Sequence, residues 1–224
     1  MNPSSPDILP ATDLALMLRS HTKTLHTAAE RAGLMPDLLR GHIERSQYCR
    51  LLRNFHEIYS ALESALARHA SQPSLQALQI SGLSRRNALA ADLAVLHGEK
   101  WQAEIPLAHA GRDYAQRLRE LEANQPQLLL AHSYVRYLGD LSGGQMLRQI
   151  VARALQLDGG AGLAFYTFTD PDATELAARY RRALQHLSID SHTAAKIVEE
   201  AQSAFQRHIA LFEELAMPTA GALI

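Results

Sequence analysis

Residues 134–144 read Tyr-Val-Arg-Tyr-Leu-Gly-Asp-Leu-Ser-Gly-Gly, which places three glycines and an aspartate within a pattern that is otherwise helical. Apolar residues continue at helical spacing on both sides, from Leu128 to Leu155. Each glycine in a helix interior costs about 1 kcal/mol relative to alanine. The stretch therefore predicts one long, kinked helix whose bare backbone lets a flat ligand approach closely.

Apolar residues recur at helical spacing along most of the chain, and no comparable alternating strand pattern is present. One apolar stripe spans residues 52–66 and another spans 197–215. Asp170 followed by Pro171 indicates a helix start, because aspartate suits the cap and proline the first helical position. The sequence thus predicts an all-α, single-domain helical bundle. The expected helices lie at about 12–32, 45–69, 84–97, 105–123, 126–156, 171–187 and 191–216.

The 224-residue chain is long enough for one domain with a substantial core. We expect this domain to cover residues 12–216, between an amino-terminal arm over 1–11 and a tail over 217–224. The formal net charge of −1 gives no global attraction to nucleic acid or to an anionic membrane. Nucleic acid is therefore not expected as a partner, and other partners must be recognised locally.

Cys49 is the only cysteine, which excludes an internal disulfide and fits a reducing compartment. The first residues lack the basic and apolar segments of a secretory signal. No stretch approaches the roughly eighteen consecutive apolar residues that a membrane-spanning helix requires. We expect a cytoplasmic protein with no membrane anchor, and a monomer because the sequence contains no obvious exposed apolar seam.

Residues 136–144, Arg-Tyr-Leu-Gly-Asp-Leu-Ser-Gly-Gly, closely resemble the distal helix of the heme oxygenase family. Residues 23–30, Lys-Thr-Leu-His-Thr-Ala-Ala-Glu, look like that family's proximal helix, and residues 162–168 resemble its later loop. Two further blocks match at residues 57–63 and 204–215. The five blocks follow the family's order over nearly the whole chain. The resemblance implies an all-α bundle that holds heme between its first helix and the glycine-kinked helix.

His26 is the iron ligand that the resemblance implies. The helix face that carries it also offers cations and a carboxylate, and its members are Arg19, Lys23, His26 and Glu30. Spacing alone favours a solvated face with a contact between His26 and Glu30. The resemblance reverses this interpretation, because His26 matches the family's proximal ligand and neutral imidazole binds heme iron. Glu30, one turn later, is expected to orient the imidazole, and Phe205, in the matched block 204–215, is expected to line the heme pocket.

Three other histidines have an informative context. His132 precedes the glycine-rich stretch and is expected to join a supporting polar network. His56 and His208 lie beside or on apolar stripes and are expected to be core residues.

The oxygen side of the heme is expected to be built by the glycine-rich helix. The resemblance implies that its glycines admit dioxygen and steer it onto a meso carbon of the ring. It also implies that Asp140 acts through ordered water to deliver protons on this side. Arg136 lies one turn before Asp140, and it and Tyr59 match positions associated with the water network. The alternative is an ordinary surface pair worth a few tenths of a kcal/mol. The glycines concerned are Gly139, Gly143 and Gly144.

Propionate binding is expected at four positions that match basic or hydroxylic residues of the family, namely Arg19, Lys23, Tyr134 and Arg181. Ala177, one turn before Arg181, departs from the pattern, because family members carry a lysine there. Arg179 and Arg182 are candidates to replace that charge, the alternative being a solvated face. Since propionate contacts fix the rotation of the ring, this departure bears on the bilin isomer, for which the α-isomer is expected.

The resemblance implies an enzyme that uses dioxygen and reducing equivalents to cleave heme to biliverdin, carbon monoxide and ferrous iron. The electron donor would be a ferredoxin, a flavodoxin-like protein or a flavin reductase. A heme carrier is the first alternative, and it would keep His26 without needing Asp140 or the glycines. A helical enzyme without heme is the second, but it would need an activated thiol, and Cys49 lacks evident support for one.

Overall fold

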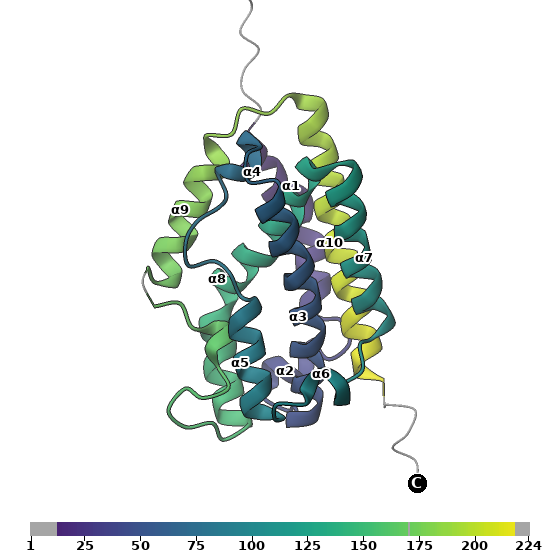
Figure 1. Ribbon diagram of the computed structural model, residues 1–224, viewed down its shortest axis with the longest axis vertical. Helices are drawn as coiled ribbons and strands as arrows, with labels where there is room; N and C mark the ends of the chain where they lie inside the picture. Colours follow the sequence, from purple (N-terminus) through teal and green to yellow (C-terminus); the bar gives the residue numbers. More distant parts are fainter. Residues whose placement is uncertain (1–12, 170, 218–224) are drawn as a thin grey trace, which may run out of the picture.

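The computed structural model describes residues 13–169 and 171–217, and every regular element within them is helical, as the sequence predicts (Figure 1). The long helices are α1 (Leu14–Glu30), α3 (Arg45–Arg68), α7 (His109–Asn124), α8 (Leu129–Ala154) and α10 (Ser191–Ala216). Two shorter helices are α5 (Arg86–Leu96) and α9 (Ala173–Gln185). Short elements complete the bundle: α2 (Met35–Arg40), α4 (Pro73–Gln76), α6 (Trp101–Glu104), and the 3₁₀ turns η1 (Pro126–Leu128) and η2 (Ala164–Tyr166).

Aspartate caps fix where three helices begin. The carboxylates of Asp13, Asp172 and Asp190 each accept a hydrogen bond of 2.9 Å from a backbone N–H in the first turn of α1, α9 and α10. Such a cap is worth about 1 kcal/mol. The predicted start of α9 is therefore wrong by two residues, because Asp172 is the cap and Pro171 precedes it. Asp170 itself lies outside the described residues.

All seven predicted helices are present, with ends that differ by a few residues. The largest difference is at α7, which begins at His109 instead of residue 105. Ile105 is extended there, as expected for a residue before a proline. The sequence prediction missed α2, α4 and α6, since helices of four to six residues are too short to show a helical period.

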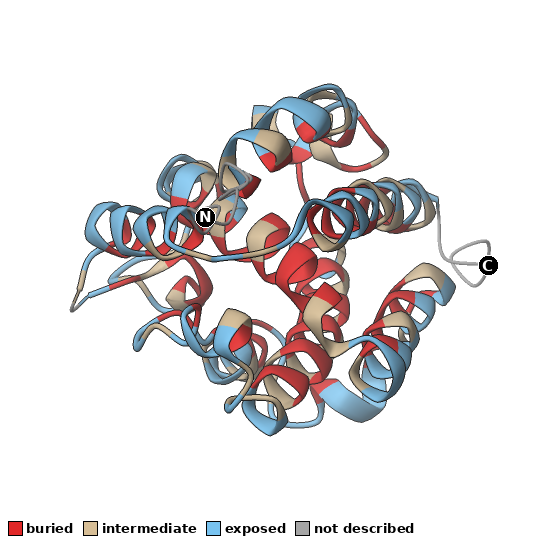
Figure 2. Cartoon of the chain, turned by 90° about the horizontal axis from the view of Figure 1, so that it is seen from above, coloured by how far each residue is buried: buried red, intermediate tan, exposed pale blue. Residues whose placement is uncertain are grey.

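The bundle is organised around α3, α8 and α10. α3 packs on α7 and α5, α1 packs on α10, and α8 packs on both α9 and α10. Buried residues line the inner faces of these helices, as seen along the bundle in Figure 2. Large aromatic side chains are among the most deeply buried, including Tyr59, Tyr114, Tyr180 and Phe165.

α8 runs as one helix through Gly139, Gly143 and Gly144, so the prediction of a single helix is confirmed, while its kink remains a prediction. The arm predicted over 1–11, and all of the predicted tail except Met217, lie outside the described residues. Within residues 13–169 and 171–217, no helix combines the length and apolar character needed to cross a membrane.

Candidate active site

Asp140 is buried on α8 and takes part in a closed triangle of hydrogen bonds. Arg136, one turn earlier, donates from Nη2 to Asp140 Oδ1 over 3.0 Å. Tyr59 on α3 donates its hydroxyl to Asp140 Oδ2 and accepts from Arg136 Nε over 3.2 Å. Asp140 and Arg136 are each 7% exposed, so this is no surface pair. The structure thus brings together the three side chains that the sequence assigned to the oxygen side.

Burial dominates the electrostatics of this triangle. It raises the pKa of the Asp140 carboxyl above its ordinary value, against the charge of Arg136, the hydrogen bond from Tyr59 and the charge of Arg85. Burial alone would lower the pKa of Arg136, but Asp140 and Tyr59 hold it above its ordinary value. The Arg136 guanidinium also lies over the Phe55 ring, with 4.2 Å between its Cζ and the ring centroid. The result is a fixed carboxylate whose proton affinity is raised.

His208 on α10 is a neighbour of this triangle that the sequence analysis missed. It is buried, as predicted, but its Nε2 lies 2.8 Å from Arg136 Nη1. Its Nδ1 lies 2.8 Å from the carbonyl oxygen of Ala204. An apolar stripe that contains a single histidine was the only available signal, and it does not distinguish a packed ring from a hydrogen-bonded one.

His132 belongs to a second buried polar cluster, as the sequence predicts, and its direct partners are Glu200 and Tyr114. Its Nε2 is 2.9 Å from Glu200 Oε1 and its Nδ1 is 3.1 Å from the Tyr114 hydroxyl. Arg117 Nη2 donates to Glu200 over 2.6 Å. Although burial raises it, the pKa of Glu200 is held at about 2 by hydrogen bonds from His132 and Arg117. The sequence analysis missed this buried glutamate.

The three glycines of α8 differ in their surroundings. A Cβ added at Gly139 or Gly143 would meet no atom within 4 Å, whereas one at Gly144 would lie 3.3 Å from Tyr166 Cδ1. Gly139 and Gly143 therefore leave open space over the helix surface. Gly144 is buried and allows close packing of Tyr166, so its predicted role toward a ligand remains a prediction.

His26 lies on the exposed face of α1. Its side chain is 55% exposed, and its Nδ1 is 3.7 Å from Glu30 Oε1, which is too far for a hydrogen bond. Its ring meets Phe205 of α10 edge-on, with 5.8 Å between centroids. The structure brings His26 and Phe205 together, while Glu30 does not hold the ring.

Two of the four predicted propionate contacts, Arg19 and Arg181, lie near enough to a third, Tyr134, for their charges to act on its hydroxyl. Burial raises the pKa of Tyr134, against a hydrogen bond with Thr22 and the charges of Arg19 and Arg181. Arg181 Nη2 also lies 3.4 Å from Ser142 Oγ on α8. The fourth residue, Lys23, lines a hollow of about 510 Å³ along α1.

Ala177 is buried on α9, whereas Arg181, one turn later, is exposed. Of the two candidates to replace a charge at position 177, Arg179 is an ion-pair partner of Glu175. Arg182 is exposed on the same helix.

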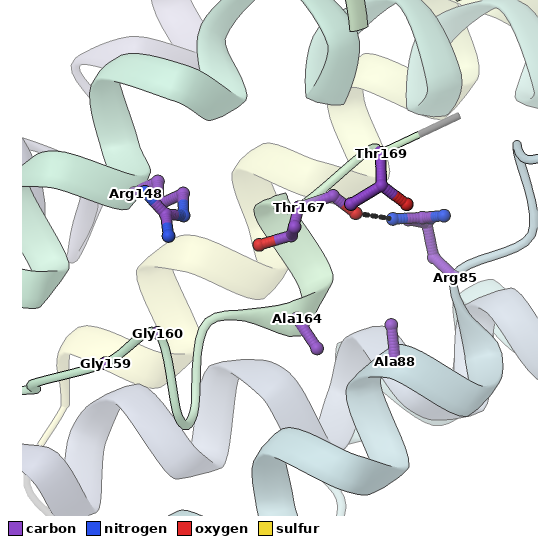
Figure 3. A pocket seen from close by; sticks show the side chains of 8 residues that line it. All are labelled: Arg85, Ala88, Arg148, Gly159, Gly160, Ala164, Thr167 and Thr169. Atoms are coloured by element: carbon purple, nitrogen blue, oxygen red, sulfur yellow. Dashed lines mark hydrogen bonds between the residues drawn. The ribbon is translucent and has the colours of Figure 1, made fainter. Parts of the chain in front are cut away.

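A separate hollow of about 430 Å³ lies between α5, α8 and the loop after α8 (Figure 3). Arg85 lines it and is 7% exposed. Its guanidinium donates to the carbonyl oxygens of Gly82, Leu83 and Thr167 over 2.8 to 3.0 Å. Arg85 thus ties the segment after α8 to the start of α5, and its charge opposes the rise in the pKa of Asp140. The sequence analysis did not identify it.

Cys49 is a free, buried thiol on α3. Burial raises its pKa, against the charge of Arg45. This is the opposite of the activation that a thiol nucleophile needs.

The fold is that of an all-α, heme-degrading oxygenase, as comparisons with known proteins show. The heme oxygenase family model matches residues 12–214. A heme oxygenase 1 of Nostoc sp. is 43% identical over 92% of this chain and 87% of its own length. The human heme oxygenase 1 is 39% identical over 96% of this chain and 75% of its own. The crystal structure of heme oxygenase-1 from Synechocystis sp. in complex with heme has a TM-score of 0.87 at 40% identity, covering 91% of this chain and 92% of that one.

The chain belongs to the heme oxygenase family, whose function is the degradation of heme to biliverdin. The residues present fit a heme group. A Cβ at Gly139 or Gly143 would meet no atom within 4 Å, so the backbone there is open to the approach of a flat ring. His26 offers an accessible imidazole on α1, the helix that the resemblance assigns to the opposite face of the heme. Arg19 and Arg181 supply positive charge for carboxylates beside Tyr134.

Proposed function

We propose that this chain cleaves heme with His26 as the iron ligand and Asp140 as the residue that positions protons on the oxygen side. The observation that carries the proposal is the buried triangle of Asp140, Arg136 and Tyr59 on a helix whose backbone is open at Gly139 and Gly143. A protein that only stored or carried heme would gain nothing from a buried carboxylate held in this way. When bound, the heme supplies the iron at which dioxygen is activated and the porphyrin that is cleaved.

Arg136 and Tyr59 each hold one oxygen of the Asp140 carboxylate, so its orientation is fixed before any ligand binds. Because burial raises the pKa of Asp140, its carboxylate binds a proton more strongly than an exposed aspartate does, which suits a group that positions protons through ordered water. The bare backbone at Gly139 and Gly143 provides access for dioxygen beside this carboxylate.

Arg19, Tyr134 and Arg181 are the proposed propionate contacts, supported by the positive charge that Arg19 and Arg181 exert on the Tyr134 hydroxyl. Lys23 is proposed as an additional positive charge at the mouth of the pocket. Because the buried Ala177 supplies no charge, the rotation of the heme ring depends on these four propionate contacts. We propose the α-isomer of biliverdin as the product. Electrons are proposed to come from a ferredoxin, a flavodoxin or a flavin reductase.

The test is to add one equivalent of hemin and a reductant under oxygen, with catalase present to remove free peroxide. The Soret band, biliverdin and carbon monoxide are then followed together. Loss of the Soret band with both products supports the proposal and reports the isomer. A stable heme spectrum without turnover would instead identify a heme carrier.

His26→Ala isolates the role of the iron ligand. We expect the variant to lose the histidine-ligated heme spectrum and to regain it when imidazole is added. His21→Ala is the matched control, because His21 is also exposed on α1 but is bonded to the carbonyl oxygen of Met17. An unchanged spectrum in His26→Ala would show that another residue binds the iron.

A further inference from the structure

We infer that His208 is a positioning residue of the site, a neutral ring protonated at Nδ1 that holds Arg136 in place against Asp140. The inference rests on the proposed function for its consequence in catalysis, but its geometry does not depend on bound heme. It gives a role to a buried ring that the mechanism above does not use.

The two polar neighbours of His208 require the same tautomer. The carbonyl oxygen of Ala204, 2.8 Å from Nδ1, can only accept a hydrogen bond, so Nδ1 carries the proton. The Arg136 guanidinium, 2.8 Å from Nε2, can only donate, so Nε2 carries the lone pair. Both contacts are satisfied only by the neutral ring in this one tautomer.

The packing around His208 keeps the ring in this orientation. The rings of Phe55 on α3, Tyr114 on α7 and Phe212 on α10 lie 4.9 to 6.4 Å from its centroid. The charged or titratable groups that face it are Arg136 and His132 on α8 and Tyr114 on α7. Burial and the charge of Arg136 lower the pKa of His208 well below its ordinary value, against the contact with Ala204, which keeps the ring neutral.

His208 is the third point that fixes the Arg136 guanidinium. Nε points to Tyr59, Nη2 to Asp140 and Nη1 to His208. Two of these partners belong to the triangle itself, whereas His208 anchors it to α10. Without the Nη1 contact, the guanidinium is held only by Tyr59 and Asp140, so the position of its charge relative to the carboxylate is less tightly fixed.

α10 thereby connects the two sides of the site. Phe205 meets the His26 ring, and His208, three residues later on the same helix, holds Arg136. A displacement of α10 therefore acts on the proposed iron ligand and on Asp140 together.

The competing interpretation is a core histidine that only fills space. Two substitutions separate the alternatives. In His208→Gln the amide oxygen can accept from Arg136, whereas His208→Leu fills a similar volume with no acceptor. His56→Leu is the control, because His56 is also buried on an apolar stripe but its ring packs on Trp101.

The first measurement is the nitrogen–proton NMR spectrum of the histidine rings in the protein without heme. We expect His208 to be neutral and protonated at Nδ1 at pH 7. A proton on Nε2, or on both nitrogens, would overturn the inference. Because no heme is present, this result is independent of whether the protein degrades heme.

The second measurement is a carbon NMR titration of the Asp140 carboxyl in each variant, also without heme. Since Arg136 opposes the rise in the pKa of Asp140, a displaced guanidinium should raise that pKa further, by about one unit in His208→Leu. His208→Gln and His56→Leu should stay within a few tenths of the wild-type value. An equal pKa of Asp140 in the Gln and Leu variants would show that His208 only fills space. If the Leu variant does not fold, a wild-type pKa of Asp140 in the Gln variant, together with the Nδ1 proton, supports the inference.

Discussion

Arg136 and Asp140 are one turn apart on α8 and form an ion pair of 3.0 Å inside the core of the bundle. An exposed pair at this spacing stabilises a helix by only a few tenths of a kcal/mol. Here both groups are buried, so removing either leaves an uncompensated charge away from water. The pair therefore matters less as a source of stability than as a means of fixing one carboxylate.

Asp140→Ala should separate binding from catalysis. We expect heme to bind with an unchanged Soret band, while biliverdin formation falls by about 100-fold or more through loss of the proton-positioning group. The free energy of unfolding should also fall by about 3 kcal/mol, because Arg136 is left unpaired. Turnover and urea denaturation measure the two effects. Asp172→Ala, which removes only the cap of α9, should lower the free energy of unfolding by about 1 kcal/mol and keep turnover. Wild-type turnover in Asp140→Ala would refute the proposed role of Asp140.

Gly139→Ala and Gly143→Ala should have opposite effects on stability and on heme affinity. In the protein without heme, the added methyl group meets nothing, so each substitution should raise the free energy of unfolding by up to about 1 kcal/mol. The same methyl group occupies the space proposed for the ring and should weaken heme binding. Hemin titration and thermal unfolding test both effects. Gly144→Ala is the comparison, since its methyl group presses on Tyr166 and should not stabilise. Wild-type heme affinity in Gly139→Ala and Gly143→Ala would argue against a ring over α8.

The sequence was sufficient to predict the all-α fold and the grouping of Asp140 with Arg136, because both depend on periodicity and on short spacing along one helix. Tyr59 could be grouped with them only through the family resemblance, since it lies on another helix. The contact of His26 with Phe205 likewise depends on how α1 packs on α10.

The sequence could not predict contacts that depend on tertiary packing. His208 and Glu200 lie on α10, and their partners come from α7 and α8. Helical spacing gives the direction in which each side chain points but not what it meets there. The differing environments of Gly143 and Gly144 have the same origin, since only the packed structure brings Tyr166 against one of two adjacent glycines.

Glu200→Ala should destabilise the protein more than an exposed substitution does. It leaves His132 and Arg117 without their carboxylate partner, and we expect a loss of about 3 kcal/mol in the free energy of unfolding. Glu175→Ala is the control, because it removes an exposed partner of Arg179 and should cost less than about 1 kcal/mol. Urea denaturation at pH 7 measures both, and similar losses in the two variants would contradict the importance of burial.

His56 should make the protein sensitive to acid. Burial, with the charges of Arg53 and Arg86, lowers the pKa of His56 to about 4, whereas the unfolded chain has a value near 6.5. The unfolded state therefore binds a proton first as the pH falls, so the stability associated with neutral His56 is present above pH 6.5 and is lost toward pH 4. His56→Gln should reduce the slope of unfolding free energy against pH in this window by up to about 1.4 kcal/mol per pH unit. Trp101, the only tryptophan, packs on His56 and reports unfolding by fluorescence. Above pH 7 the His56 ring is neutral in both the folded and the unfolded protein, so measurements there give the cost of the substitution itself. An unchanged slope below pH 6.5 would mean that His56 is not buried as a neutral ring.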